Sequence, residues 1–307
     1  MSYLTISQTL LVMVLWAVCF PLITVGIQYA PHLTFASLRA VLAGIILTGL
    51  ALALRQPLPT DRKVWLMIAG VGLGATTLGF LGMFHAAEFI SPGIATVIAN
   101  TQPLLAAILA GVVLNERLNV RGKVGLALGF VGIVTITLPR FLAADQDSYL
   151  VGVAYITMAA AGITVSNVLI KRITGTVDAL MAMGLQMLFG SIPLAIAAWA
   201  MEDPLTVRWT PPFITSLLIL SVLGSAFVYW LWFNVLEKVQ LNRANAFSFL
   251  VPVIGLTIGT LFYGERLGSM QLIGVVLTIA GVSLVVRRQA LPPSSAGINP
   301  PHRIRMP

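Results

Sequence analysis

The stretch V-L-N-E-R-L-N at residues 113–119 has a counterpart in the second half of the chain, F-Y-G-E-R-L-G at residues 262–268. Both place the charged triplet E-R-L at the end of a long apolar run, and the two triplets are 149 residues apart. Only 9% of the 307 residues are charged, so a repeated charged triplet indicates internal duplication.

The same offset of 149 residues aligns the sequence on both sides of this triplet without a gap. The aligned pairs include two prolines and several small residues: Ala95 with Ala244, Pro103 with Pro252, Gly125 with Gly274 and Gly132 with Gly281. The front portions match more loosely, with Arg39 near Gln186. The sequence therefore predicts two related halves, residues 4–138 and 150–287.

The composition identifies these halves as membrane-embedded. Hydrophobic residues make up 58% of the chain and the mean hydropathy is +0.96, whereas soluble domains carry about 25% charged residues. Stretches of about 20 apolar residues, enough to cross a bilayer, occur at 4–27, 34–54, 64–85, 92–114, 121–138, 150–171, 178–200, 213–236, 243–263 and 269–286. We predict an all-α integral membrane protein with ten transmembrane helices, followed by a disordered Pro-rich tail at 290–307.

Five helices per repeat is an odd number, so the second repeat should be inverted relative to the first. Alternate connections carry twelve Lys or Arg residues, while the intervening ones carry only Arg140, Arg208 and Arg266. The positive-inside rule then places both termini in the cytoplasm and explains the net charge of +8 without a nucleic-acid partner. Two inverted five-helix repeats are typical of secondary transporters, whose substrate site lies between the repeats.

Three runs resemble the EamA family of the drug/metabolite transporter superfamily: L-W-A-V-C-F-P at 15–21, F-A-S-L-R-A-V-L-A-G at 35–44, and the P-L-L-A-A-I-L-A-G-V-V-L-N-E-R-L segment at 103–118. The resemblance implies a bacterial inner-membrane carrier of small organic metabolites, often an exporter of amino acids. The chain is also similar to exporters of aromatic amino acids, but Asn100 and Gln102 stand where those exporters carry aromatic residues. A nucleotide-sugar or drug-type carrier is the alternative within the superfamily.

Two prolines direct the search for a substrate site. Pro103 and Pro252 fall near the centres of the predicted helices 92–114 and 243–263, where each removes a backbone hydrogen bond. Polar side chains lie just before both prolines: Asn100, Thr101 and Gln102 in one half, Asn245 and Ser248 in the other. We predict a central polar cavity built from both halves; the alternative is a pair of structural kinks satisfied by neighbouring helices.

Other polar and aromatic residues within the predicted helices are further candidates. Gln186, Asn167 and Ser166 either contact substrate or hydrogen-bond neighbouring helices, because an amide facing lipid loses its hydrogen bonds. Aromatic walls of the site, or simple packing positions, are expected from Trp16, Phe84, Tyr229 and Trp230.

Two basic side chains are candidates for gating. Arg39 lies within the second predicted helix, where it either snorkels toward the headgroups or faces a carboxylate. His85 ends the third predicted helix at the same face; it is either structural or a group that titrates near neutrality.

The residues that are absent from the predicted helices limit the mechanism. None of the ten acidic residues falls at mid-membrane, so we expect a neutral or zwitterionic substrate and no buried carboxylate relay. The sequence has no Walker loop and no H-E-x-x-H motif, and we expect no cofactor, metal or catalytic residue. We predict a monomeric carrier that works by alternating access, with an intramembrane enzyme or a channel as alternatives.

Overall fold

Long apolar segments form helices in the bilayer because a helix satisfies its own backbone polar groups. The computed structural model describes residues 1–86, 89, 98–141, 149–263 and 268–286, and every regular element within those ranges is helical. The predicted tail at 290–307 lies outside the described residues, as does the second E-R-L triplet.

The first half contains α1 (Tyr3–Gly26), α2 (His32–Ala53), α3 (Arg62–Val71), η1 (Gly72–Leu78), α4 (Gly79–Ala86), α6 (Gln102–Val113) and α7 (Val120–Phe141). The second half contains α8 (Tyr149–Ile173), α9 (Ala179–Met201), η2 (Pro204–Thr206), α10 (Pro211–Ser221), η3 (Val222–Phe227), α11 (Val228–Lys238), α12 (Leu241–Ala246), η4 (Phe247–Phe249), α13 (Leu250–Tyr263) and α14 (Ser269–Val286).

Eight helices within the described ranges are long and apolar enough to cross a membrane. These eight coincide with eight of the ten predicted stretches. The other two stretches correspond to α6, which has only 12 residues, and to α7, which is not among the eight. Large apolar side chains are exposed on the bundle surface, among them Ile108 (68%), Val112 (76%) and Ile196 (64%). Such a surface suits lipid rather than water, so a multi-pass membrane protein is confirmed, while ten spans remain a prediction.

The order of the elements is similar in the two halves. In both halves a helix passes into a π-helical segment and then continues as a helix: α3, η1 and α4 in the first, α10, η3 and α11 in the second. The segments η1 and η3 begin at Gly72 and Val222, within one residue of the offset found in the sequence. A π-helical turn is rare, so its recurrence at the same place supports the repeat.

Helices that correspond between the halves pack against each other in antiparallel pairs. On α7 and α14, a methyl group placed on Gly125 would lie 2.7 Å from the carbonyl oxygen of Gly281, and one on Gly132 would lie 2.7 Å from that of Gly274. Gly125 corresponds to Gly274 in the sequence alignment of the halves, and Gly132 corresponds to Gly281. Exchanging the two halves therefore turns one of these contacts into the other, as in a two-fold interface.

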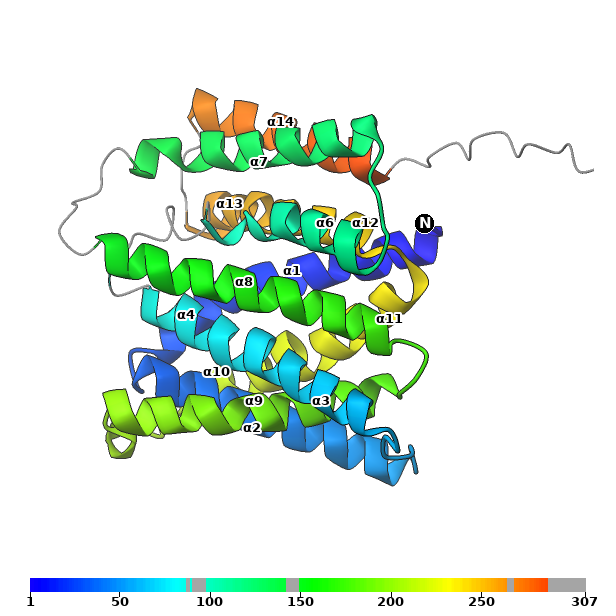
Figure 1. Cartoon of the computed structure of the whole chain (residues 1–307). Helices are drawn as coiled ribbons and strands as arrows, with labels where there is room; N and C mark the ends of the chain where they lie inside the picture. The colour runs from blue at the N-terminus through cyan, green and yellow to red at the C-terminus, as the bar shows by residue number, and fades with distance from the viewer. Residues whose placement is uncertain (87–88, 90–97, 142–148, 264–267, 287–307) are drawn as a thin grey trace, which may run out of the picture.

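The pair α2 and α9 has the same arrangement. Gly44 packs against Leu188, while Thr48, one turn further along α2, packs against Gly184 on α9. Figure 1 shows the pair α7 and α14 at one edge of the bundle and the pair α2 and α9 at the opposite edge, with the remaining helices between them.

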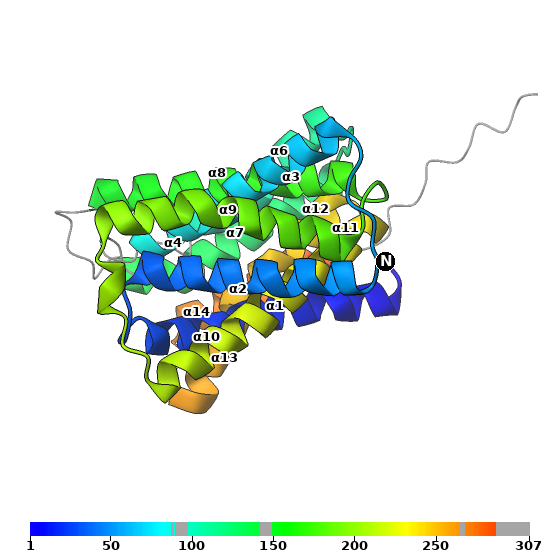
Figure 2. The ribbon, with the colours of Figure 1, turned by 90° about the horizontal axis from the view of Figure 1, so that it is seen from below.

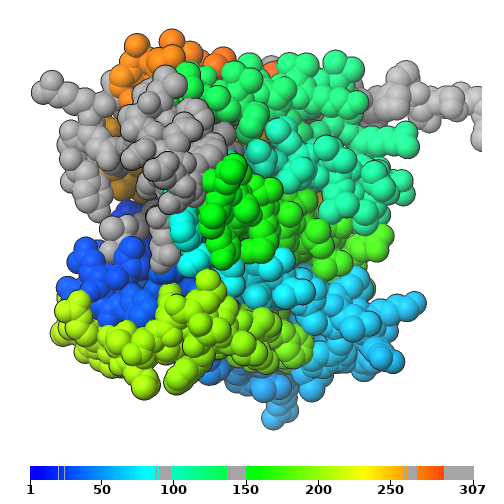
Figure 3. Space-filling model, turned by 60° about the vertical axis from the view of Figure 1, so that its left-hand side comes forward, coloured from blue at the N-terminus to red at the C-terminus, as the bar shows by residue number. Residues whose placement is uncertain are grey.

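The two ends of the bundle differ in charge. The N-terminus and the connections 54–61, 114–119, 174–178 and 239–240 lie at one end, which we call the basic end (Figures 1 and 2). Figure 3 shows the opposite end, where the connection between α1 and α2 lies beside that between α9 and α10. There the Arg208 backbone N–H donates to the Tyr29 carbonyl at 2.8 Å.

The first E-R-L triplet joins the two halves at the basic end. After α6, Asn115 adopts a left-handed conformation (φ 56°) that ends the helix. The following Glu116 accepts a 3.3 Å hydrogen bond from the backbone N–H of Asn242, in the first turn of α12, and its carbonyl accepts one from the Asn242 amide at 3.0 Å. Helix N-termini favour carboxylates, so the described triplet has a structural role.

Candidate functional site

Each half contains a broken helix immediately before its proline. The structure differs here from the prediction of continuous helices: residues 100–101 form a turn, and Pro103 lies in the first turn of α6. In the second half α12 gives way to the 3-10 turn η4, and Pro252 lies in the first turn of α13. Proline is favoured in a first turn because the N–H it lacks has no partner there. Broken helices are typical of transporter substrate sites.

A chain of two buried hydrogen bonds links α11, α8 and α12 next to the second break. The Trp232 indole N–H donates to Asn167 Oδ1 at 2.9 Å, and Asn167 Nδ2 donates to Asn245 Oδ1 at 3.4 Å. An indole can only donate, so Asn167 must turn its oxygen to Trp232 and its nitrogen to Asn245. Asn245 must then accept through its oxygen, which leaves its own nitrogen as the end of the chain.

Aromatic rings surround this chain. The ring of Trp16 lies 5.4 Å from that of Trp232 and 6.3 Å from that of Tyr229, measured between centroids. We call Trp16, Asn167, Tyr229, Trp232 and Asn245 the Asn–Trp cluster. It draws on α1, α8, α11 and α12, and so on both halves.

Trp232 is the member that sequence reasoning missed. Sequence analysis favoured Trp230, which is half-buried and packs on Phe227 with a centroid distance of 5.8 Å. Helical spacing could have identified Trp232 from the sequence. Trp232 follows Tyr229 by three residues and therefore lies on the same helix face, whereas Trp230, one residue after Tyr229, lies on another.

Three buried side-chain amides lack an acceptor among the described residues: Gln186, at the contact of α9 with η1, and two near the breaks, Gln102 and Asn245. Gln102 Nε2 and Asn245 Nδ2 have no hydrogen-bond partner among the described residues, and their side chains are 8% and 0% exposed. An unpaired buried donor is costly, so each of these nitrogens is suited to bind an acceptor oxygen of a ligand. Asn100 is buried in the turn before Gln102, while the Thr101 hydroxyl donates to the Ile98 carbonyl at 2.7 Å.

Several other candidates lie outside the cluster. Gln186 accepts a 3.0 Å hydrogen bond from the Thr76 hydroxyl in η1, and the Ser166 hydroxyl donates to the Val71 carbonyl at 3.0 Å. Phe84 packs on Phe80, with ring centroids 6.1 Å apart. Ser248 is half-buried in η4. The contacts of Gln186 and Ser166 join α9 to η1 and α8 to α3, while Gln186 Nε2 has no partner among the described residues.

Arg39 is inside the protein. Its side chain is only 4% exposed and its guanidinium donates to Ser225 Oγ at 2.7 Å and to the Gly224 carbonyl at 2.8 Å. The interpretation that Arg39 snorkels to the headgroups therefore does not fit the structure. The π-helical segment η3 supplies both acceptors.

His85 belongs to a cluster at the end opposite the basic end. Its Nδ1 lies 3.3 Å from Nε2 of His32, and Nδ1 of His32 lies 3.4 Å from Glu202. The Glu202 carboxylate accepts from the backbone N–H groups of Leu33 and Thr34, each at 2.8 Å. These contacts join α2, α4 and the residue that follows α9.

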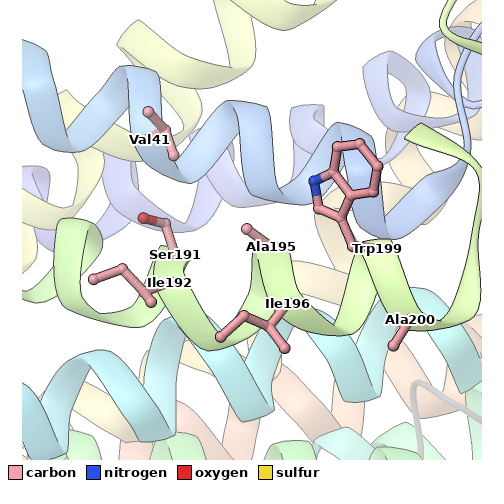
Figure 4. A pocket seen from close by; sticks show the side chains of 7 residues that line it. All are labelled: Val41, Ser191, Ile192, Ala195, Ile196, Trp199 and Ala200. Carbon is pink, nitrogen blue, oxygen red and sulfur yellow. The ribbon is translucent and has the colours of Figure 1, made fainter. Parts of the chain in front are cut away.

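A surface groove of about 610 Å³ lies between α2 and α9. Figure 4 shows its lining: Val41 from α2, and Ser191, Ile192, Ala195, Ile196, Trp199 and Ala200 from α9. The lining is almost wholly apolar and its side chains include some of the most exposed apolar groups of the protein, such as Trp199 (65%). The groove therefore faces lipid, and none of the candidate residues lines it.

Comparison with known proteins gives a consistent result. A model of the EamA-like transporter family matches residues 4–138 and again residues 150–287. The uncharacterized transporter YvbV of Bacillus subtilis is 27% identical, over 93% of each chain. A probable amino-acid metabolite efflux pump of Escherichia coli is 28% identical, over 90% of this chain and 93% of its own. Protein PecM of Dickeya dadantii is 28% identical, over 91% and 93%.

A solved crystal structure shares the fold. Its chain superimposes with a TM-score of 0.75, at 18% identity, covering 91% of this chain and 97% of its own.

Proposed function

The chain belongs to the EamA-like transporter family and crosses the membrane several times, and on this premise we propose that it exports amino acids or similar small amphipathic metabolites. The transport is secondary and crosses the bacterial inner membrane. The name of the E. coli relative, a probable amino-acid metabolite efflux pump, supports this substrate class, and the organisms of the bacterial relatives support this location.

One observation carries the proposal: the hydrogen-bonded chain from Trp232 through Asn167 ends at the unpartnered, buried nitrogen of Asn245. A site of this kind offers a donor for a substrate oxygen and aromatic faces for its apolar part. The acidic residues of the described helices lie at helix ends or in connections. A zwitterionic substrate therefore suits the site better than a bare cation.

We expect the protein, reconstituted alone in liposomes, to take up L-amino acids at a rate that saturates with concentration. A panel of radiolabelled amino acids, with protein-free liposomes as control, measures this directly. A rate that rises linearly with concentration indicates a channel. No flux for any member of the panel contradicts the proposed substrate class.

The architecture that we propose is two inverted repeats, residues 4–138 and 150–287, that rock about the Asn–Trp cluster in a monomer. Its support is the antiparallel packing of corresponding helices, α7 with α14 and α2 with α9. Collection of the basic connections at one end supports cytoplasmic termini.

Single cysteines test this topology in a Cys19→Ala background, where no other thiol is present. Arg117→Cys should react with an impermeant maleimide only from the cytoplasmic side, and Arg266→Cys, at the corresponding place in the repeat, only from outside. Labelling of both positions from one side contradicts the inverted arrangement.

A further inference from the structure

Arg39 is a buried cation that has no matching anion in the part of the chain that the structure describes. Its guanidinium contacts only neutral groups: Ser225 Oγ at 2.7 Å, the Gly224 carbonyl at 2.8 Å and Cys19 Sγ at 3.8 Å. Its carbon Cζ also lies 5.1 Å from the centre of the Phe80 ring. No carboxylate among the described residues forms an ion pair with it. Arginine does not lose its proton in proteins, and a buried charge that lacks a partner is costly.

The other half of the protein has a neutral residue at the corresponding contact. Arg39 on α2 binds the hydroxyl of Ser225 in η3, while Gln186 on α9 binds the hydroxyl of Thr76 in η1, at 3.0 Å. Thr76 and Ser225 are separated by the repeat offset of 149 residues. A neutral amide therefore joins the helix to the π-helical segment in one half, so this contact does not by itself require the positive charge of Arg39.

Arg39 is also close to the Asn–Trp cluster. Its neighbour Cys19 follows Trp16 by three residues along α1, and its neighbour Ser225 precedes Tyr229 by four residues along the helix of η3 and α11. One helical turn is about 5 Å, so the guanidinium lies about one turn from the cluster, away from the basic end. A molecule about one helical turn long would reach from the guanidinium to the cluster.

We propose that Arg39 binds the carboxylate of the transported substrate, whose remaining part contacts the Asn–Trp cluster. This inference rests on the proposed function and adds the chemical group that is recognised. A planar guanidinium matches a carboxylate in shape and charge. Arg39 uses Nε and Nη2 for its bonds to the protein, and Nη1 makes no hydrogen bond to the described residues. The bound carboxylate supplies the missing counter-charge.

Benzoate and benzamide test this without a transport assay, because they have nearly the same shape and differ in charge. We expect benzoate to raise the midpoint of thermal unfolding of the full chain in detergent, at a concentration about tenfold lower than benzamide requires. Arg39→Gln introduces the residue of the other half and should abolish this preference. Arg39→Lys keeps the charge and should retain part of it.

Arg208→Gln is the matched control, since it removes an exposed cation at the same end of the bundle and should leave the benzoate response unchanged. Equal responses of the wild type to benzoate and benzamide, or an unaltered preference in Arg39→Gln, would overturn the inference. Saturable amino-acid uptake together with an unaltered preference in Arg39→Gln refutes the role of Arg39 alone. Benzoate selectivity that requires Arg39, without amino-acid uptake, refutes the proposed transport and leaves the carboxylate site in place.

Discussion

Asn245→Leu is expected to lower the initial rate of amino-acid uptake in liposomes about tenfold, since a buried oxygen of the bound substrate then lacks its donor, which costs about 1–3 kcal/mol. The leucine side chain has a similar volume but offers no donor to the substrate. It also leaves the nitrogen of Asn167 without the oxygen that now accepts its hydrogen bond at 3.4 Å. The rate is measured at a substrate concentration well below saturation, on protein that elutes as a single species.

Two further variants make this result interpretable. Asn245→Asp keeps the shape and the acceptor but removes the N–H donor, so it should also transport poorly if the donor binds the substrate. Asn234→Leu is the matched control, because Asn234 lies on α11 and donates only to the Trp230 carbonyl of its own helix, at 2.7 Å. Wild-type uptake by Asn245→Leu, or an equal loss in Asn234→Leu, would remove the Asn–Trp cluster from the substrate site.

Gly281→Ala is expected to destabilise the protein by about 1–3 kcal/mol, the usual cost of overpacking. A methyl group there would lie 2.4 Å from the backbone nitrogen of Gly129 and 2.6 Å from the carbonyl oxygen of Gly125. Both obstacles are backbone atoms, so α7 and α14 must separate to make room. The midpoint of thermal unfolding in detergent measures the loss.

Gly49→Ala supplies the comparison for this variant. Gly49 lies in α2, and a methyl group there meets nothing within 4 Å. Alanine is the better helix former by about 1 kcal/mol, so Gly49→Ala should unfold at the wild-type temperature or above it. If Gly281→Ala proves as stable as Gly49→Ala, the close contact of α7 with α14 is not part of the native state.

The membrane fold was predictable because an apolar segment of about 20 residues has the length that a helix needs to cross a bilayer. Both boundaries of α2, α8 and α14 lie within two residues of the ends of the apolar stretches 34–54, 150–171 and 269–286. The sequence places Pro103 and Pro252 near the centres of continuous helices, because hydropathy stays high through both segments, so the breaks before them were not predicted. Only backbone geometry distinguishes a proline in a first turn from one in mid-helix.

The candidate site was predictable in part. Polar residues within apolar helices directed attention to Asn167 and Asn245, and the structure places their amides in contact. Whether Trp232 or Trp230 faces the cluster depends on how α11 is oriented about its own axis, and the helices packed against it determine that orientation. The burial of Arg39 was not predictable either, because it follows from the shape of η3, whose π-helical turn places the Gly224 carbonyl and the Ser225 hydroxyl beside α2.

Alternating access between two halves is the central claim, and counterflow in liposomes tests it most directly. Liposomes containing the protein are loaded with a high concentration of an unlabelled amino acid and diluted into a trace of the same compound carrying a label. A carrier that exchanges substrate across one alternating site predicts a transient internal accumulation of label above the external concentration. Label that only equilibrates, without overshoot, would contradict a carrier and indicate a channel.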